Sequence, residues 1–293
     1  MLSILIPFSA ALLFPVAAMA SKRAMELTRD PWGVLLAGNA ATACVFLPLF
    51  FFDGKPPPLE NAYQPIAAGL LFFLAQVAAY KSFAFGDLSV AIPAQGAKVL
   101  LVAAFTVLML DEAVSPQLWA AAALTAAALY FLQDRSSGGA HSFKRLRATL
   151  GLALLASAAF AGFDVAVQKW TPGWGVQRFG PWVFLSQAVF SLSLLFLPGE
   201  RRWHYGLRAW GWTAMGSLGM ALITLSLVAV IGLYGKATLV NILFNSRCIW
   251  SVVLVWLAGR WFGNREARSG RGAMSHRLMG SLFMMAAIGL ALL

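Results

Sequence analysis

Residues 31–48 read PWGVLLAGNAATACVFLP, and residues 181–198 read PWVFLSQAVFSLSLLFLP. Both stretches open with Pro-Trp and close with Phe-Leu-Pro, so five residues recur at a displacement of 150 positions. The same displacement, to within one residue, relates three further pairs: Phe14-Pro15-Val16-Ala17 and Phe163-Asp164-Val165-Ala166, Gly86 and Gly235, and Lys98 and Arg247. A near-constant displacement from residue 14 to residue 98 favours a tandem repeat over chance agreement in a chain rich in Leu and Ala.

The composition predicts that the repeated unit lies in a membrane. Of the 293 residues, 60% are hydrophobic and only 11% are charged, which is more apolar surface than a soluble domain of this length can bury. A run of about 20 apolar residues spans a bilayer as a helix, and the runs in this chain are too continuous for the strands of a barrel. Ten such runs are present, at about 2–20, 32–52, 64–86, 88–110, 115–133, 149–170, 181–198, 209–231, 237–258 and 277–293. We therefore expect an all-α membrane protein with ten transmembrane helices.

The first apolar run has a second interpretation, as a signal peptide. It ends in Ala18-Met19-Ala20, which fits a signal-peptidase site. However, Lys22 and Arg23 follow the run instead of preceding it, and the run has its own copy around Phe163. We expect it to be retained as the first helix, because its removal would leave the repeat unpaired.

Basic residues are sorted between alternate connectors of the ten predicted helices. The connectors after helices 1, 3, 5, 7 and 9 hold 16 Lys and Arg residues, and those after helices 2, 4, 6 and 8 hold 4. By the positive-inside rule the odd connectors are cytoplasmic, so both termini lie on the outer side of a bacterial inner (plasma) membrane. The net charge of +11 is thereby explained as a topology signal. Nucleic-acid binding is not expected, because the short loops offer no basic face for a duplex.

Five helices per half is an odd number, so the second half enters the membrane from the opposite side. We predict two five-helix inverted-topology repeats, at 1–134 and 149–293, joined by a cytoplasmic linker at 135–148. This architecture is typical of secondary transporters, in which two halves meet around a site at the bilayer midplane.

The end of the first repeat carries a resemblance to a known family. Gly86-Asp87-Leu88-Ser89-Val90-Ala91 leads into the helix to Leu110, and Asp111-Glu112 and Ser115-Pro116 precede a closing Ala/Leu helix. The second half repeats the pattern loosely from Gly235 to Glu266, with a longer Arg-rich insertion. In this the chain resembles EamA-type transporters of the drug/metabolite transporter (DMT) superfamily over essentially its whole length. Taken as a whole, the sequence is most similar to the aromatic amino-acid exporter (YddG-like) branch of that superfamily, and this resemblance implies amino-acid export.

Lys98 and Arg247 are cations placed near the midplane of the fourth and ninth predicted helices. A cation at this depth costs at least about 2.5–3.5 kcal/mol to insert. One interpretation is that both face a central polar cavity and attract a carboxylate or phosphate. The other is that each pairs with a buried carboxylate or carbonyl and fixes its helix in place.

Asp164 is the one acidic residue well inside a predicted span. It has three possible roles, which are coupling to protons, binding a substrate amine, and pairing with Lys98 or Arg247. Small multidrug-resistance relatives place a glutamate in their first helix, whereas the first half of this chain offers Phe14-Pro15. This departure argues against proton-driven drug antiport.

Uncharged candidates for the substrate site are amides and aromatic residues deep in the predicted helices. Gln95 shares a helical face with Lys98, and the nearby Pro93 predicts a kink. Packing between helices is the alternative role for each of them. The remaining candidates are Gln76, Tyr80, Asn241, Asn245, Phe163, Phe244 and Trp250.

An intramembrane enzyme is the rival class, and the sequence argues against it. All three histidines (His141, His204 and His276) fall in predicted connectors, and no catalytic dyad, metal-ligand spacing or nucleotide-binding loop is present. We expect no cofactor and no ATP-binding module, and we expect the bilayer and a small molecule as partners; a monomer and a homodimer both remain open. The sequence thus predicts an alternating-access exporter of a small zwitterionic metabolite such as an amino acid. An anionic substrate, such as a sugar phosphate, lipid phosphate or organic anion, is the alternative.

Overall fold

A computed structural model describes residues 2–52, 59–86, 88–110, 140–197, 205–258 and 271–290, together with 116, 117, 120, 124 and 128. Every regular element in these residues is a helix. Six helices are long and apolar enough to cross a membrane: 2–28, 31–52, 63–85, 144–174, 176–196 and 207–234. They confirm the predicted runs at 2–20, 32–52, 64–86, 149–170, 181–198 and 209–231 as helical. The predicted fifth helix, 115–133, lies almost entirely outside the described residues.

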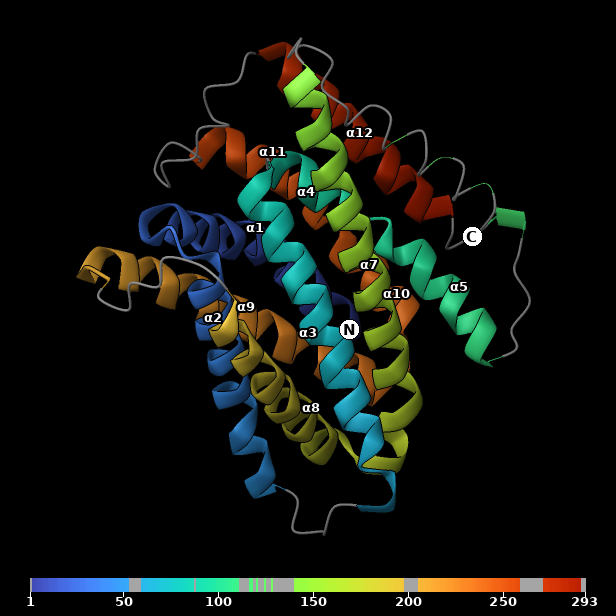
Figure 1. Cartoon of the computed structure of the whole chain (residues 1–293). Helices are drawn as coiled ribbons and strands as arrows, with labels where there is room; N and C mark the ends of the chain where they lie inside the picture. The colour runs from blue at the N-terminus through green and yellow to red at the C-terminus, as the bar shows by residue number, and fades with distance from the viewer. Residues whose placement is uncertain are drawn as a thin grey trace.

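The first half contains α1 (Leu2–Thr28), α2 (Pro31–Phe46), α3 (Tyr63–Phe85), α4 (Leu88–Gln95) and α5 (Lys98–Leu110), with short 3-10 turns η1 (Leu47–Phe52) and η2 (Leu59–Asn61). The second half contains α7 (Ala140–Trp174), α8 (Val176–Ser191), η3 (Leu192–Phe196), α9 (Leu207–Tyr234), α10 (Ala237–Asn245), α11 (Arg247–Ala258) and α12 (Arg271–Leu290). Figure 1 shows the two halves interleaved as one bundle. Because α7 begins at Ala140, His141 and the second part of the predicted linker 135–148 are helical, not connector.

Two of the predicted spans differ from expectation because each is broken in the middle. The run 88–110 divides into α4 and α5 at Gly96-Ala97, and the run 237–258 divides into α10 and α11 at Ser246. At both breaks the backbone makes i→i−3 bonds, from Ala97 N to Ala94 O (3.2 Å) and from Ser246 N to Leu243 O (3.2 Å). Glycine and serine are poor helix formers, so each span gives way where one of them stands. The residue that starts the second segment is Lys98 in one span and Arg247 in the other.

Helix ends also follow the repeated sequence. Gly86 and Gly235 are the C-cap residues of α3 and α9. Gly235 adopts a left-handed φ of 61° and donates from its N–H to Ile231 O at 2.9 Å, a conformation that glycine adopts at little cost. The turns that these glycines form lead directly into the two broken spans.

The packing between helices runs mainly from one half to the other. α1 packs along α9, and α3 packs along α7. α2 contacts α8 and α9, while α8 contacts α3 as well. The broken segments meet crosswise, α4 on α11 and α5 on α10. These contacts come in corresponding pairs. When α1, α2, α3, α4 and α5 are exchanged for α7, α8, α9, α10 and α11, each contact becomes another contact of the same set, and the contact of α2 with α8 becomes itself.

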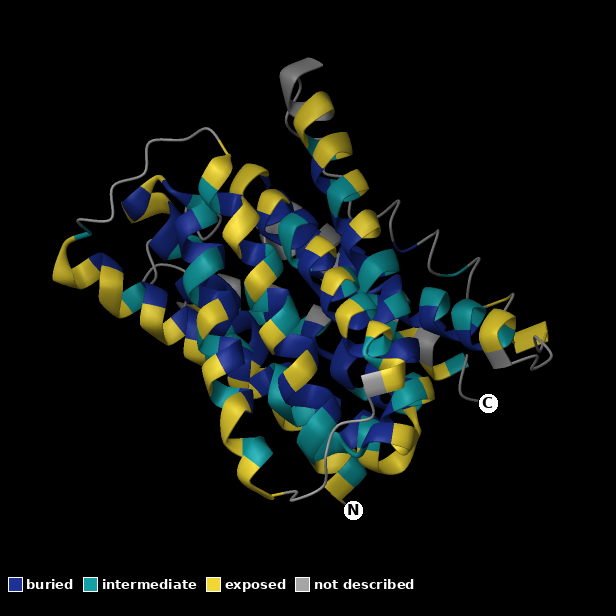
Figure 2. Cartoon of the chain, turned by 60° about the horizontal axis from the view of Figure 1, so that its bottom comes forward, coloured by how far each residue is buried: buried dark blue, intermediate teal, exposed yellow. Residues whose placement is uncertain are grey.

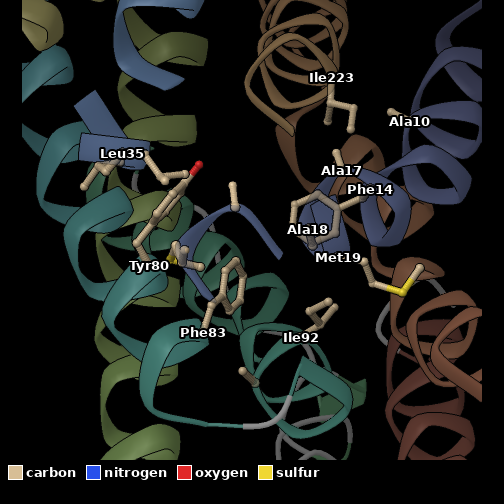
Figure 3. Packing of buried hydrophobic residues seen from close by; sticks show 14 of the residues in the cluster. Ala10, Phe14, Ala17, Ala18, Met19, Leu35, Tyr80, Phe83, Ile92 and Ile223 are labelled. Carbon is tan, nitrogen blue, oxygen red and sulfur yellow. The ribbon is translucent and has the colours of Figure 1, made fainter. Parts of the chain in front are cut away.

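Buried residues occupy the interior of this bundle, and exposed residues cover its outside (Figure 2). Much of the outside is apolar, with Leu5, Leu13, Leu155 and Leu222 each more than half exposed, as expected for helices that face lipid. Inside, Phe14 and Ala17 of α1 lie near Ile223 of α9 in one core cluster (Figure 3).

Candidate functional site

A cavity of about 70 Å³ lies at the centre of the bundle. Its walls come from α1, α3, α4, α5, α7, α9, α10 and α11, so the breaks in both divided spans reach it. The volume holds several water molecules but is smaller than the 300–1,000 Å³ or so of a drug-sized pocket. A substrate therefore enters only if the lining side chains move apart.

Eight of the eleven residues predicted from sequence line this cavity. Three are charged, three are polar and two are aromatic: Lys98, Asp164 and Arg247; Gln76, Tyr80 and Gln95; Phe163 and Phe244. The three charged residues are buried, with 8%, 4% and 5% of their surface exposed. Charges of both signs thus meet in the interior of the bundle, where an uncompensated one is costly.

Lys98 and Asp164 form an ion pair across the two halves. Lys98 Nζ lies 2.6 Å from Asp164 Oδ2 and 5.4 Å from the centroid of the Phe160 ring. The same Oδ2 atom accepts a hydrogen bond from Asn241 Nδ2 at 2.5 Å. Asp164 therefore links α5, α7 and α10.

Arg247 occupies a different environment, between two aromatic rings. Its Cζ atom lies 4.5 Å from the centroid of the Phe14 ring and 4.4 Å from that of Phe244. The two rings pack edge to face, with centroids 5.5 Å apart. Cation–π contacts of this kind stabilise a guanidinium out of water.

Side chains of the second half donate hydrogen bonds to two carbonyl groups at the first-half break. Asn245 Nδ2 donates to Gly96 O at 3.0 Å, and Ser157 Oγ donates to Gln95 O at 3.1 Å. The last carbonyls of a helix have no partner inside it, so these two bonds stabilise the end of α4. Gln95 itself is 1% exposed, and its Nε2 has no hydrogen-bond partner among the described residues.

Three predicted site residues lie outside the cavity lining. Asn241 reaches the site through Asp164, and Asn245 bonds to the break at Gly96. Trp250 packs against Phe8, with ring centroids 6.5 Å apart. None of the three forms part of the cavity wall.

The sequence analysis missed several aromatic lining residues. Phe14, Phe72, Phe83 and Phe160 line the cavity, and Phe72 packs against both Phe160 and Phe163, with centroids 5.4 Å and 4.7 Å apart. One of them had a usable signal, because Phe14 is the repeat counterpart of Phe163. Together they make the wall largely aromatic. Among the described residues, no three His, Cys, Asp or Glu side chains gather as a metal site would require.

The all-helical fold agrees with what comparisons with known proteins find. Residues 1–133 match the family described as the EamA-like transporter family. This part of the chain is similar to the EamA-like transporter family. The likeness suggests a membrane transporter of the DMT superfamily, and the six helices that are long and apolar enough to cross a membrane agree with it.

A solved structure titled "Crystal structure of protein" has the same overall fold as this chain, with a TM-score of 0.67 and 18% sequence identity. The match covers 97% of this chain and 95% of the other. At this identity the likeness concerns the fold. No curated protein matches the chain.

Proposed function

We propose that this chain is an alternating-access secondary transporter that exports a small zwitterionic metabolite, with amino acids, aromatic ones included, as its substrates. The observation that carries the proposal is the central cavity, in which Lys98, Asp164 and Arg247 lie among aromatic side chains. A zwitterion presents charges of both signs and finds opposite charges of both signs there. Aromatic walls suit an apolar or aromatic substrate side chain.

We further propose that the two halves form the inverted repeat and exchange roles as the cavity opens to either side. The interchangeable contacts between the halves support this, since the pairs α1–α9 and α3–α7, and α4–α11 and α5–α10, are counterparts. Two broken helices facing each other at the cavity also fit, because discontinuous helices form the midplane sites of many secondary transporters. The small cavity volume requires such a movement for substrate entry.

An anionic substrate remains the second candidate, and the charge arrangement disfavours it. Asp164 lines the same cavity as Arg247, so a phosphate dianion would meet a carboxylate as well as the cations. Lys98 is already engaged by Asp164. The three charges together carry a net charge of one positive, which suits a single carboxylate better than a dianion.

The test is transport by the purified protein in liposomes. Counterflow of labelled amino acids, organic anions and sugar phosphates would be measured in parallel, with protein-free liposomes as the control. We expect uptake of aromatic amino acids and none of sugar phosphates. Uptake of sugar phosphates without amino acids would replace the proposal with the anionic alternative.

The proposed orientation, with both termini outside a bacterial inner membrane, has a separate test. Single cysteines at positions in 134–148 and 259–276 would be introduced after replacing Cys44 and Cys248, so that each variant carries one thiol. We expect both connectors to resist an impermeant thiol reagent on intact cells and to react after lysis. Labelling of both connectors from outside would show that the orientation is the reverse of the one proposed.

A further inference from the structure

We infer that Asp164 binds the ammonium group of the substrate, that Arg247 and Gln95 bind its carboxylate, and that Lys98 is a positioning residue for Asp164. This inference rests on the proposed function, because it assigns an orientation to a zwitterion in the same cavity. It also reverses the sequence-based hypothesis that Lys98 attracts the negative substrate group.

Of the two carboxylate oxygens of Asp164, one accepts hydrogen bonds from the described residues and the other does not. Its Oδ2 accepts from Lys98 Nζ at 2.6 Å and from Asn241 Nδ2 at 2.5 Å. Its Oδ1 accepts no hydrogen bond from the described residues. A carboxylate has acceptor sites on both oxygens, so Asp164 is able to accept an ammonium group from the cavity without releasing Lys98.

Lys98 is poorly placed to be the carboxylate receptor. Its ammonium group is engaged by Asp164 and lies over the Phe160 ring. A substrate carboxylate at Lys98 Nζ would approach Asp164, and two carboxylates at one site repel each other. The role that fits these contacts is to hold the Asp164 carboxylate in its orientation.

Arg247 has the geometry that suits a carboxylate. Phe14 and Phe244 lie 4.5 Å and 4.4 Å from its Cζ, and contacts with ring faces hold the orientation of a planar guanidinium. The N–H donors project from the guanidinium edge in the fork that matches a carboxylate. Arg247 is also the first residue of α11, where the helix dipole adds positive potential.

Gln95 supplies an independent indication of a ligand. It lines the cavity and is 1% exposed, yet its Nε2 donates to no described residue. A buried donor left without an acceptor is costly, and a substrate carboxylate would remove that cost. Because α4 packs on α11, Gln95 and Arg247 are carried by neighbouring segments.

The experiment measures the binding of three probes to the wild type and to variants of the full-length protein purified in detergent. The probes are phenylalanine, phenylalanine amide, which keeps the ammonium group, and 3-phenylpropionate, which keeps the carboxylate. Binding would be measured by calorimetry. In the wild type we expect both analogues to bind at least about 10-fold more weakly than phenylalanine, because each leaves buried polar groups of the site unpaired.

The variants should then separate the two ends of the substrate. Arg247→Gln should weaken phenylalanine and 3-phenylpropionate about 10-fold or more and leave phenylalanine amide unchanged, and Gln95→Leu should do the same to a smaller extent. Asp164→Asn should weaken phenylalanine and the amide and leave 3-phenylpropionate unchanged. Arg208→Gln is the matched control, since it makes the same change on an exposed side chain, and it should alter none of the three.

As a positioning residue for Asp164, Lys98 should affect binding of the amide and not of 3-phenylpropionate. Lys98→Met should weaken the amide and leave 3-phenylpropionate unchanged, and Lys98→Arg should restore binding of the amide. If Asp164→Asn fails to fold, the variant Asp164→Asn/Lys98→Met, which removes both charges, takes its place with the same expected loss of the amide.

The outcomes distinguish this inference from the proposed function. A stable wild type that neither binds nor transports any amino acid would refute the proposed function itself. Binding of phenylalanine with the reverse pattern, in which Asp164 or Lys98 variants weaken 3-phenylpropionate and Arg247→Gln weakens the amide, would overturn only the orientation. Equal losses for all probes in every variant would overturn it as well, because the charges would then have no separate partners.

Discussion

Lys98 and Arg247 occupy the same place in the two halves and have different surroundings. Each is the first residue after the break in a divided span. Lys98 is paired with a carboxylate at 2.6 Å, whereas Arg247 lies against two phenyl rings. A buried ammonium and a buried guanidinium are therefore stabilised in two different ways within one cavity.

Asp164 has no acidic counterpart at the corresponding position of the first half. Asp164 of α7 stands where the first half has Pro15 of α1, and the preceding residue is Phe in both cases. The phenylalanine is used in both halves, since Phe14 contacts Arg247 and Phe163 lines the cavity. A carboxylate at this position in one half, with none at the corresponding position of the other, gives the cavity two chemically different ends.

The largest expected effect comes from removing the carboxylate. Asp164→Leu leaves Lys98 buried without its counter-charge and should lower stability by about 3–5 kcal/mol, measured as thermal unfolding in detergent. Asp164→Leu/Lys98→Met removes both charges and should recover most of the loss. A single variant as stable as the wild type would show that the ion pair between the two halves does not stabilise the protein.

The reverse change should make the two halves alike. Pro15→Asp places a carboxylate in the first half where Asp164 stands in the second, and we expect it to pair with Arg247. Because a charged hydrogen bond is worth about 1.5–3 kcal/mol, phenylalanine counterflow should fall about 10-fold or more. Pro15→Asn is the uncharged control, and equal transport by the two variants would contradict the prediction.

A smaller effect is expected where the two breaks touch. Asn245→Ala removes the bond from Nδ2 to Gly96 O and should cost about 1 kcal/mol of stability, again read from thermal unfolding. Ser226→Ala, whose hydroxyl bonds within its own helix to Leu222 O, is the control and should cost less. If the two variants unfold at the same temperature, the contact between the breaks adds nothing.

The smallest effect concerns the link between the halves at the α1–α2 turn. Tyr205 donates its hydroxyl to Asp30 Oδ2 at 2.7 Å, and burial, followed by the bond to Asp30 and its charge, raises the pKa of Tyr205. A raised pKa means that the folded protein holds this proton more tightly, so the contribution to stability is full below about pH 10 and is lost as the pH rises further. Tyr205→Phe should flatten the loss of thermal stability between about pH 9 and 11, and an unchanged slope would contradict this.

Much of the fold could be predicted from the sequence because apolar runs of bilayer length leave a chain few alternatives. Six spans were predicted, five of them to within five residues at each end and the first, 2–20, eight residues short, and Lys98 and Arg247 were recognised as interior cations. A kink was predicted at Pro93, but the breaks at Gly96-Ala97 and Ser246 were not. Polar residues flank both breaks, yet each run averaged over the length of a bilayer stays apolar, so the average does not reveal that the helix is interrupted.

Most residues of the candidate site were predicted from the sequence, but the contacts between them were not. The pair of Lys98 with Asp164 was one of several alternatives, because spacing along separate helices does not determine which of them touch. Phe72 and Phe160 were missed since a membrane protein with 22 Phe residues offers many equivalent candidates. Trp250 was included on depth alone, which does not indicate which way a helical side chain points.

The bond between Asn245 and Gly96 joins positions that correspond to each other in the two halves, 149 residues apart. When two bodies trade orientations by turning about a common axis, displacement grows with distance from that axis, and a contact between corresponding points lies close to it. In the proposed alternating-access movement, this bond would therefore lie near the axis, and the far ends of the helices would move furthest. Lys98 and Arg247, which we propose as site residues, are each within two positions of this bond in the sequence, so they would move little while the two ends of the bundle open and close.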